Sequence, residues 1–281
     1  MKISGFTIAR NIEKYSYPYK EAILSVLPIC DEFIVNVGNS EDNTLELIRG
    51  IAPDKIRIVT GEWDDSKGKE MLSVETNFAM SHCRGDWAFY VQLDEVVHEK
   101  DLKVLKGYMT KYLGDPGVDA FRFKWLHFYG SYYRYRIDPP WYQKQDRIVR
   151  NNGTVESYGD AWAFRKKDGT ELRTVKTPCF IYHYGWVNPP GLMARKRRNA
   201  ENIGFARLGD NERKEEYDFG DPGRFPVYFG THPAVMSGKV LAHAPSREDR
   251  RNIIKRYFWS PFLWFGVRYK TFLRGKKSIP V

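Results

Sequence analysis

A short apolar segment that ends in two acidic residues, within 85–97, constrains the fold of this chain more than any other part. The segment reads G-D-W-A-F-Y-V-Q-L-D-E-V-V, with a Gly-Asp turn followed by five apolar or aromatic residues from Trp87 to Val91. Such a run after a turn is typical of a fully buried strand. Asp94 and Glu95 then lie at the C-terminal end of the strand, where open α/β sheets bind their ligands.

The acidic pair has two interpretations. Mg²⁺ and Mn²⁺ prefer oxygen ligands and often use one or two carboxylates together with substrate phosphates, which would make Asp94 and Glu95 part of a metal-assisted site. Alternatively, the pair caps the helix that follows, because Glu95, Glu99 and Asp101 all favour a helix N-terminus. The segment alone leaves both interpretations open.

The first half of the chain alternates strand-like and helix-like segments. The expected strands cover 3–9, 32–37 and 56–59, and the expected helices cover 19–27, 43–51 and 73–83. Short parallel strands joined by crossover helices form a doubly wound sheet. We therefore predict an α/β fold with a mostly parallel central sheet flanked by helices.

The second half has a different pattern. A strand that starts at Asp119 alternates basic and aromatic residues, and a second aromatic strand at 180–186 contains His183. A histidine in such a strand is more often a hydrogen-bonded core residue than a ligand. Between the two strands we expect a loop, after R-I-V-R at 147–150, which contains Glu156 and Asp160. The basic segment at 194–199 is compatible with a solvated helix face.

The composition is that of an ordinary globular protein, with 42% hydrophobic and 28% charged residues among 281. No apolar run approaches the roughly 18 residues needed to cross a bilayer, and the N-terminus does not resemble a signal peptide. We therefore expect a cytoplasmic protein. Cys30, Cys83 and Cys179 are odd in number and widely spaced, so buried thiols are expected rather than disulfides or a zinc site.

A formal charge of +10 and 15% aromatic residues admit nucleic acid, anionic lipid or a phosphorylated, sugar-bearing substrate as partner. Residues 250–277 interleave Arg and Lys with aromatic residues such as Trp259 and Trp264. This pattern suits an interfacial helix on an anionic membrane surface, such as the inner face of the plasma membrane. A C-terminal helix docked on the core, or a subunit interface, is the competing interpretation.

The order of the motifs resembles the bacterial GT-A glycosyltransferases of family 2. A first strand ends I-A-R-N, a second is followed by G-N-S-E-D-N-T, and T-N-F-A-M-S-H-C-R-G-D-W-A-F-Y-V-Q-L-D-E comes next. The match covers about residues 1–100. It implies a GT-A, Rossmann-like fold with a nucleotide-sugar-binding half at 1–125, an acceptor-binding half at 126–190 and a helical, basic and aromatic C-terminal extension at 191–281.

The family signature Asp-x-Asp reads Q-L-D here, with Gln92 at the first acidic position and Asp94 at the last. The resemblance implies that Asp94 contacts a divalent metal, Mn²⁺ or Mg²⁺, and that His183 adds a second metal contact. Gln92 can bond a ribose hydroxyl but adds no negative charge, so weak metal binding is expected. The residues implied for the nucleotide-sugar site are Ala9, Arg10, Asn11, Asn39, Asp42, Asp65, Lys69, Gln92 and Asp94.

The resemblance also implies an inverting transfer, which needs a carboxylate base and positive charge on the departing diphosphate. We predict Asp160 as the base, with Glu156 second. Lys69, Arg147 and Arg150 are the expected sources of positive charge. Aromatic faces on which sugars could stack are provided by Trp125, Tyr129, Trp141, Trp162 and Trp186.

The predicted activity is transfer of a sugar from a nucleotide-diphosphate sugar to a glycan or lipid-linked acceptor in cell-surface polysaccharide synthesis. One alternative is a non-catalytic carbohydrate-binding protein on a transferase scaffold, which Gln92 makes more credible. A sugar nucleotidyltransferase is a second, but I-A-R-N-I-E-K-Y lacks the glycine-rich loop expected after the first strand. Nucleic acid is the weakest partner, because the sequence has no recognised nucleic-acid motif.

Overall fold

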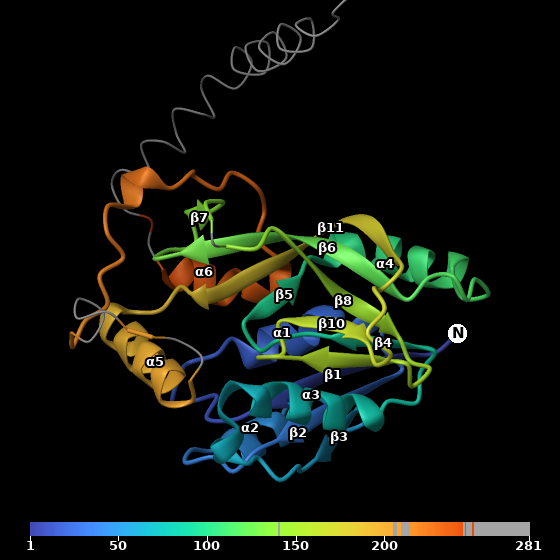
Figure 1. Cartoon of the computed structure of the whole chain (residues 1–281). Coiled ribbons are helices and arrows are strands. Elements are labelled where there is room, and N and C mark those ends of the chain that lie inside the picture. The colour runs from blue at the N-terminus through green and yellow to red at the C-terminus, as the bar shows by residue number, and fades with distance from the viewer. Residues whose placement is uncertain (140, 205–206, 209–213, 244, 246–248, 250–281) are drawn as a thin grey trace, which may run out of the picture.

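One large, mixed sheet organises the chain, as the computed structural model in Figure 1 shows. The structure describes residues 1–139, 141–204, 207–208, 214–243, 245 and 249. Neighbouring strands of the sheet follow the order β3-β2-β1-β4-β8-β6-β11-β5, and β7 pairs with β6. Its strands are β1 (Ile3–Ala9), β2 (Glu32–Val37), β3 (Ile56–Val59), β4 (Trp87–Tyr90), β5 (Glu95–Val97), β6 (Ala120–Tyr129), β7 (Tyr135–Arg136), β8 (Lys144–Arg150) and β11 (Thr174–Trp186).

Six of these strands, β1, β2, β3, β4, β6 and β11, run in one direction, whereas β5, β7 and β8 run against them. This confirms the predicted mostly parallel α/β sheet. The helices of the first half are α1 (Tyr19–Val26), α2 (Thr44–Arg49), α3 (Met71–Ser81) and α4 (Glu99–Lys111). The first three strands have the predicted bounds, and the first three helices begin and end within two residues of the predicted ones.

The two faces of the sheet bury separate cores. On one face, Phe33, Val35 and Phe89 pack with side chains of α1, α2 and α4. On the other face, Phe6 and Tyr90 pack against α3 and against a hairpin made of β9 (Val155–Tyr158) and β10 (Ala163–Lys166). Because strand side chains alternate between faces, the first strands bury apolar residues on both sides, as expected for a central parallel sheet.

The interpretation of the acidic pair as a helix cap is wrong. Glu95 begins β5 rather than a helix, and the N-cap of α4 is His98, whose Nδ1 accepts a hydrogen bond from the Lys100 N–H. Glu99 and Asp101 do lie in the first turn of α4. The strand β5 is only three residues long and pairs antiparallel with β11, so that Glu95 lies opposite His183.

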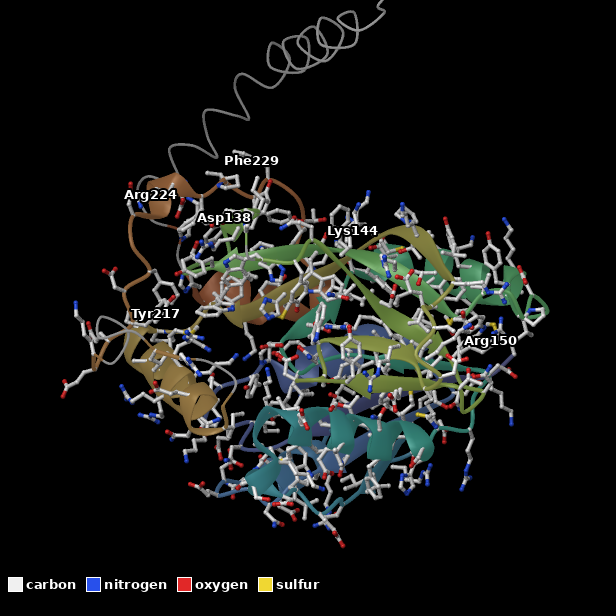
Figure 2. The ribbon with its side chains drawn as sticks, viewed as in Figure 1. Asp138, Lys144, Arg150, Tyr217, Arg224 and Phe229 are labelled. Carbon is white, nitrogen blue, oxygen red and sulfur yellow. The ribbon has the colours of Figure 1, made fainter. Side chains whose placement is uncertain are left out.

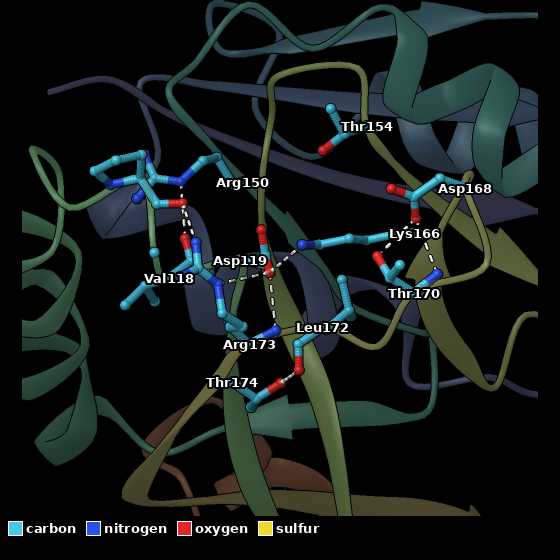
Figure 3. Close-up of polar contacts among 12 residues, drawn as sticks. Val118, Asp119, Arg150, Thr154, Lys166, Asp168, Thr170, Leu172, Arg173 and Thr174 are labelled. Atoms are coloured by element: carbon cyan, nitrogen blue, oxygen red, sulfur yellow. Dashed lines mark hydrogen bonds and ion pairs between the residues drawn. The ribbon is translucent and has the colours of Figure 1, made fainter.

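The hairpin β9–β10 is anchored at both ends. The Asp119 carboxylate accepts a hydrogen bond from the Arg173 N–H (2.8 Å) and pairs with Lys166 Nζ (3.1 Å), as Figure 3 shows. On α3, the Asn77 side chain donates to the Ser157 carbonyl (2.8 Å) and accepts from the Ser157 N–H (2.7 Å). These bonds fix the tight turn at 159–162, which joins the two strands over the end of β4.

The described part of the C-terminal region contains α5 (Pro190–Asn202) and α6 (Ser237–Ala242), with mostly irregular chain at 214–233. A buried ion pair between Arg134 and Asp249 ties this region to the sheet. No helix among the described residues is long and apolar enough to cross a membrane. Residues 250–277, for which a membrane contact is predicted, lie outside the described residues. Cys30, Cys83 and Cys179 are buried free thiols, as predicted.

Candidate active site

The Asp94 carboxylate lies at the C-terminal edge of the sheet, just before β5. The backbone carbonyl of Asp94 accepts a hydrogen bond from the Tyr184 N–H of β11 (2.8 Å), which holds the turn against that strand. The side chain is 11% exposed, and its Oδ2 lies 3.1 Å from Lys196 Nζ and 3.7 Å from His183 Nε2. Burial would raise the pKa of Asp94, but the charge and the hydrogen bond of the Lys196 ammonium group hold the pKa below its ordinary value. Asp94 is therefore ionised.

Gly185 makes room for this arrangement. A Cβ at Gly185 would overlap Asp94 Oδ2 and lie 2.7 Å from His183 Nε2. The Gly185 carbonyl also accepts a hydrogen bond from Lys196 Nζ (3.1 Å). The close approach of a carboxylate, an imidazole and an ammonium group thus requires a residue without a side chain at this position of β11.

The hydrogen bonds of two buried histidines, His127 and His183, determine their tautomers. His127 is 1% exposed, and burial lowers its pKa to about 3, so the ring is neutral. Its Nε2 donates to the Tyr142 carbonyl (2.7 Å), which leaves Nδ1 as an acceptor. His183 Nδ1, 3.1 Å away, must then donate to His127 Nδ1. Because burial also lowers the pKa of His183, its Nε2 carries no proton and presents a lone pair toward Asp94.

Lys196 is the residue of this site that the sequence did not reveal. It lies on α5, in the segment interpreted as a solvated helix face, but its side chain is only 19% exposed. Its ammonium group lies 4.4 Å from the centre of the Tyr17 ring. Burial would lower the pKa of Lys196, but Tyr17 and Asp94 raise it above its ordinary value, so the group is charged. That interpretation is wrong for Lys196.

Glu95 and Arg147 form a fully buried ion pair behind Asp94. Arg147 Nε and Nη2 each lie 2.8 Å from a Glu95 carboxylate oxygen, and neither side chain is exposed. The guanidinium group lies 4.7 Å from the centre of the Trp125 ring and donates to the Trp162 carbonyl (3.0 Å). Arg147 was predicted to act on a diphosphate, but in the described structure its charge is balanced by Glu95.

Gln92 connects the sheet edge to the turn that contains Asp160. Its side-chain amide donates to the Ala161 carbonyl (3.2 Å), and Ala161 has a left-handed backbone conformation with φ of 62°. Among the described residues, the buried Oδ1 of Asp160 has no hydrogen-bond partner. A buried carboxylate oxygen without a partner is rare and calls for a functional explanation. Asp160 thus lies in the turn that Gln92 holds through Ala161, and its predicted role as the base stays a prediction.

Glu156 and Arg150 are placed differently from Asp160. Glu156 lies in β9 rather than in the predicted loop, and it pairs with Arg165 of β10 (2.9 Å). Arg150 ends β8 opposite Trp87, at the start of β4, and therefore at the far end of that strand from Asp94. Figure 2 shows Arg150 at the side of the molecule opposite Tyr217. Its guanidinium group donates to backbone carbonyls of Tyr112, Leu113, Asp115 and Val118.

The residues predicted to bind the nucleotide gather at the ends of β1 and β2. Arg10 donates to the Asn39 carbonyl (3.0 Å) and to the Asp65 carboxylate (2.9 Å). The Asn11 side chain accepts from the Glu41 N–H (2.7 Å), which holds the two loops together. The Asp42 carboxylate accepts hydrogen bonds from the Lys14 and Thr44 N–H groups. The Ala9 carbonyl accepts a hydrogen bond from the Gly38 N–H. Lys69 is exposed in the 3-10 helix η2 (Asp65–Glu70).

Trp63 is a second residue of this region that the sequence did not reveal. It follows β3, is 7% exposed, and lies below the Arg10 guanidinium group at 5.8 Å. A Cβ at Gly38 would come within 2.5 Å of the indole ring, so the loop after β2 passes directly over it. Its Nε1 has no hydrogen-bond partner among the described residues. The ring therefore supports the loop after β2 and the Arg10 side chain from below.

Three of the five predicted aromatic residues form one cluster. Trp141 and Trp186 lie 5.1 Å apart, and Tyr129 lies 5.9 Å and 5.8 Å from them. Trp141 also lies 5.0 Å from His127, which links the cluster to His183. The other two differ, since Trp125 is buried in the core and Trp162, 39% exposed, is the last residue of the turn at 159–162.

Few of these side chains are suited to hold a metal. Asp94 Oδ2 and His183 Nε2 lie 3.7 Å apart, but no group of three or more His, Cys, Asp or Glu side chains in the described structure could hold an ion. Gln92 adds no charge, and Arg147 occupies both oxygens of Glu95. Lys196 Nζ is already bonded to Asp94 Oδ2. The protein side chains alone do not form a metal site.

A mostly parallel α/β sheet flanked by helices, with charged side chains gathered at the C-terminal ends of β1, β2 and β4, is the architecture of a GT-A type glycosyltransferase. The sequence model for glycosyl transferase family 2 matches residues 20–171, which is more than half of the 281 residues. The chain therefore belongs to glycosyl transferase family 2. None of the curated proteins matches the sequence.

Several solved glycosyltransferase structures are similar to part of the chain. S. aureus TarS 1–349 in complex with UDP has a TM-score of 0.43 and 18% identity, over 76% of this chain and 68% of that one. Glucosyl-3-phosphoglycerate synthase from Mycobacterium tuberculosis, in complex with Mn²⁺, UDP and phosphoglyceric acid, has a TM-score of 0.40 and 16% identity, over 74% and 80%. The match to another structure of S. aureus TarS covers 76% of this chain and 41% of that one.

Proposed function

We propose that the protein transfers a sugar, with inversion, from a nucleotide-diphosphate sugar to a hydroxyl group of a glycan or lipid-linked glycan. The observation that carries the proposal is the ionised Asp94 at the C-terminal edge of the sheet, with an unpartnered oxygen of Asp160 on the turn tied to Gln92. One carboxylate would orient the cation that faces the diphosphate, and the other would accept the proton of the acceptor.

The donor would lie across the ends of β1, β2 and β4. Arg10, Asn39 and Asp65 form a fixed polar group there for the nucleoside, and the Trp63 ring supports Arg10 from below. The diphosphate would then reach the edge at Asp94. In this placement the sugar faces the turn that carries Asp160, and Gln92 can offer its carbonyl oxygen to a ribose hydroxyl.

The proposed step is a single displacement. The acceptor oxygen attacks the anomeric carbon and forms the new glycosidic bond, while the bond from that carbon to the β-phosphate oxygen breaks and its electron pair leaves with the nucleoside diphosphate. The acceptor proton passes to the Asp160 carboxylate. Glu156 is less suited to the role, because Arg165 already pairs with it.

The acceptor side is proposed to be the aromatic cluster of Tyr129, Trp141 and Trp186, because sugar rings pack on aromatic faces. A lipid-linked acceptor would bring the protein to a membrane surface. Residues 250–277 are the proposed contact with anionic lipid on the cytoplasmic side. Cell-surface polysaccharide is the corresponding product class.

The experiment that tests the function is product analysis with Asp94→Asn. The wild-type protein should release nucleoside diphosphate from one of a panel of UDP and GDP sugars. Asp94→Asn keeps the shape of the side chain and should lower the rate about a hundredfold or more, with the melting temperature showing that the variant is folded.

The alternative functions give different products. A sugar nucleotidyltransferase would release inorganic diphosphate, and a non-catalytic carbohydrate-binding protein would release neither. Full activity in Asp94→Asn would show that the assigned site is wrong.

A further inference from the structure

We propose that the Lys196 ammonium group takes the place of a divalent metal at the donor diphosphate, so that transfer by this protein needs no bound metal. The proposal rests on the glycosyl transfer proposed above. Its starting point is that Lys196 Nζ lies 3.1 Å from Asp94 Oδ2, the oxygen for which the family resemblance implies a metal contact. A cation supplied by α5 thus already sits on this carboxylate.

The charges at the sheet edge agree with a monovalent cation. Gln92 replaces one of the two carboxylates of the family signature, and Arg147 neutralises Glu95 in the buried ion pair. Asp94 is then the one carboxylate of the Q-L-D-E segment that is left for a cation, and Lys196 balances its charge. A divalent ion on Asp94 Oδ2 would be repelled by the ammonium group beside it. The negative charge lost at Gln92 and the positive charge gained at Lys196 therefore both reduce the need for a divalent ion at this edge of the sheet.

The position of the ammonium group suits a phosphate oxygen. Lysine has three N–H donors, and Lys196 gives two of them to Asp94 and to the Gly185 carbonyl. The Tyr17 ring also lies 4.4 Å from the ammonium group, but no further nitrogen or oxygen among the described residues accepts the third N–H. A lysine held in this way presents a point charge to phosphate without rearrangement when charge develops on the leaving group.

The elements around Lys196 hold it in place. Figure 1 shows α5 directly after β11, and the helix begins at Pro190, where a proline is favoured. The next residue, Arg197, packs its guanidinium group 5.3 Å from the centre of the Trp186 ring. The face of α5 that carries Lys196 is therefore fixed against the acceptor half, and the ammonium group is presented from outside the sheet.

The test compares turnover with and without metal, with donor hydrolysis as the readout because water can take the place of the acceptor. After EDTA treatment and gel filtration, wild-type protein should hydrolyse its UDP or GDP sugar at the same rate as with added Mn²⁺. Lys196→Ala should lose about a hundredfold in kcat/KM without metal, and Lys196→Arg should retain part of the activity. Arg195→Ala, an exposed neighbour on the same helix, should behave as wild type.

A second measurement reads the metal directly. Lys196→Ala leaves Asp94 Oδ2 and His183 Nε2 facing each other without a competing cation. Mn²⁺ titration followed by electron paramagnetic resonance should show about tenfold tighter binding in this variant than in wild type. Added Mn²⁺ should also restore part of its hydrolysis. Lys196→Gln, which keeps a donor but no charge, repeats both measurements if the alanine variant is unstable.

Two outcomes would overturn the proposal in distinguishable ways. Turnover by wild type that stops in EDTA and returns with Mn²⁺ would show that the metal supplies the charge, and glycosyl transfer would stand. Equal Mn²⁺ affinity in wild type and Lys196→Ala would show that the Lys196 ammonium group does not take the place of the metal, and glycosyl transfer would again stand. No turnover of any nucleotide sugar, with or without Mn²⁺, would overturn glycosyl transfer and this proposal with it.

Discussion

The buried pair of Glu95 and Arg147 is the residue-scale feature on which the sheet edge depends most. Arg147→Met should lower the free energy of unfolding by about 3–5 kcal/mol, because it leaves the Glu95 carboxylate buried without its partner. Methionine is unbranched and apolar like the stem of arginine, although it gives up the contacts of the guanidinium group with the rings of Trp125 and Tyr90. Urea unfolding followed by tryptophan fluorescence measures the difference.

The matched double variant separates charge from packing. Glu95→Leu together with Arg147→Met removes both charges and should recover much of the stability lost in Arg147→Met, since an apolar pair of similar volume can replace a buried ion pair. Equal stability of the single and double variants would show that the loss comes from packing and not from the unpaired carboxylate.

His232 predicts how stability responds to acid. Burial lowers its pKa to about 4 from the ordinary 6.5, and its ring lies among Phe128, Tyr132, Tyr184 and Tyr228. Between these two pH values the unfolded chain binds the proton and the folded chain does not, so stability falls as pH falls from 6.5 to about 4. The loss is at most about 1.4 kcal/mol per pH unit.

His232→Gln should flatten this dependence, because glutamine does not titrate and can still hydrogen-bond to the Tyr184 hydroxyl. The measurement is urea unfolding of both proteins at several pH values between 4.5 and 7. Parallel dependence in the two proteins would show that His232 is not the group responsible.

A site residue could be predicted from the sequence when it lay in or next to a recognisable motif. Asp94 and Gln92 follow a strand with a recognisable start, so their place at the sheet edge could be read directly. Lys196 and Trp63 reach the site through tertiary packing, and nothing in their neighbouring sequence distinguishes them from surface or core residues. Arg147 was located correctly on R-I-V-R, but its burial against Glu95 is a property of the folded sheet.

At the scale of elements, the central parallel strands could be predicted well because long apolar runs and turn residues mark their ends. The short strands β5 and β9 could not. β5 has three residues and exists because β11 pairs with it, and β9 carries polar residues that α3 and β10 hold in place. Antiparallel additions to a parallel sheet are set by distant partners rather than by local pattern.

The close approach of β11 to Asp94 gives an element-scale prediction. Gly185→Ala places a methyl group against Asp94 Oδ2 and His183 Nε2. We expect donor turnover to fall at least about tenfold and stability to fall by about 1–3 kcal/mol from overpacking. Donor hydrolysis and urea unfolding measure the two effects.

Gly107→Ala is the matched control, since a Cβ there meets nothing within 4 Å on the exposed side of α4. It should leave turnover unchanged and raise stability by about 0.5–1 kcal/mol. Wild-type turnover in Gly185→Ala would mean that the site tolerates displacement of Asp94 or His183.

At the scale of the whole molecule, the positive charge is concentrated in one segment. Residues 250–281 contain nine Lys and Arg residues and no Asp or Glu, so they carry +9 of the net +10. The rest of the chain has 45 − 9 = 36 basic and 35 acidic residues, which leaves +1. The net positive charge is therefore a property of the C-terminal segment and its contacts, and not of the active site.

This partition predicts salt-dependent binding to anionic membranes. The full chain should co-sediment with vesicles that contain phosphatidylglycerol, and binding should weaken as salt is raised from about 0.1 M to 1 M, where the screening length falls from about 10 Å to about 3 Å. Protein ending at residue 249 should not bind, yet it should keep donor hydrolysis, because Asp94, Lys196 and Asp160 all precede the truncation. Replacing only Trp259 and Trp264 with Ser keeps the charge and separates the apolar contribution, since a purely electrostatic contact would survive it. Salt-independent binding, or equal binding by the truncated protein, would contradict a membrane role and favour a helix packed on the protein.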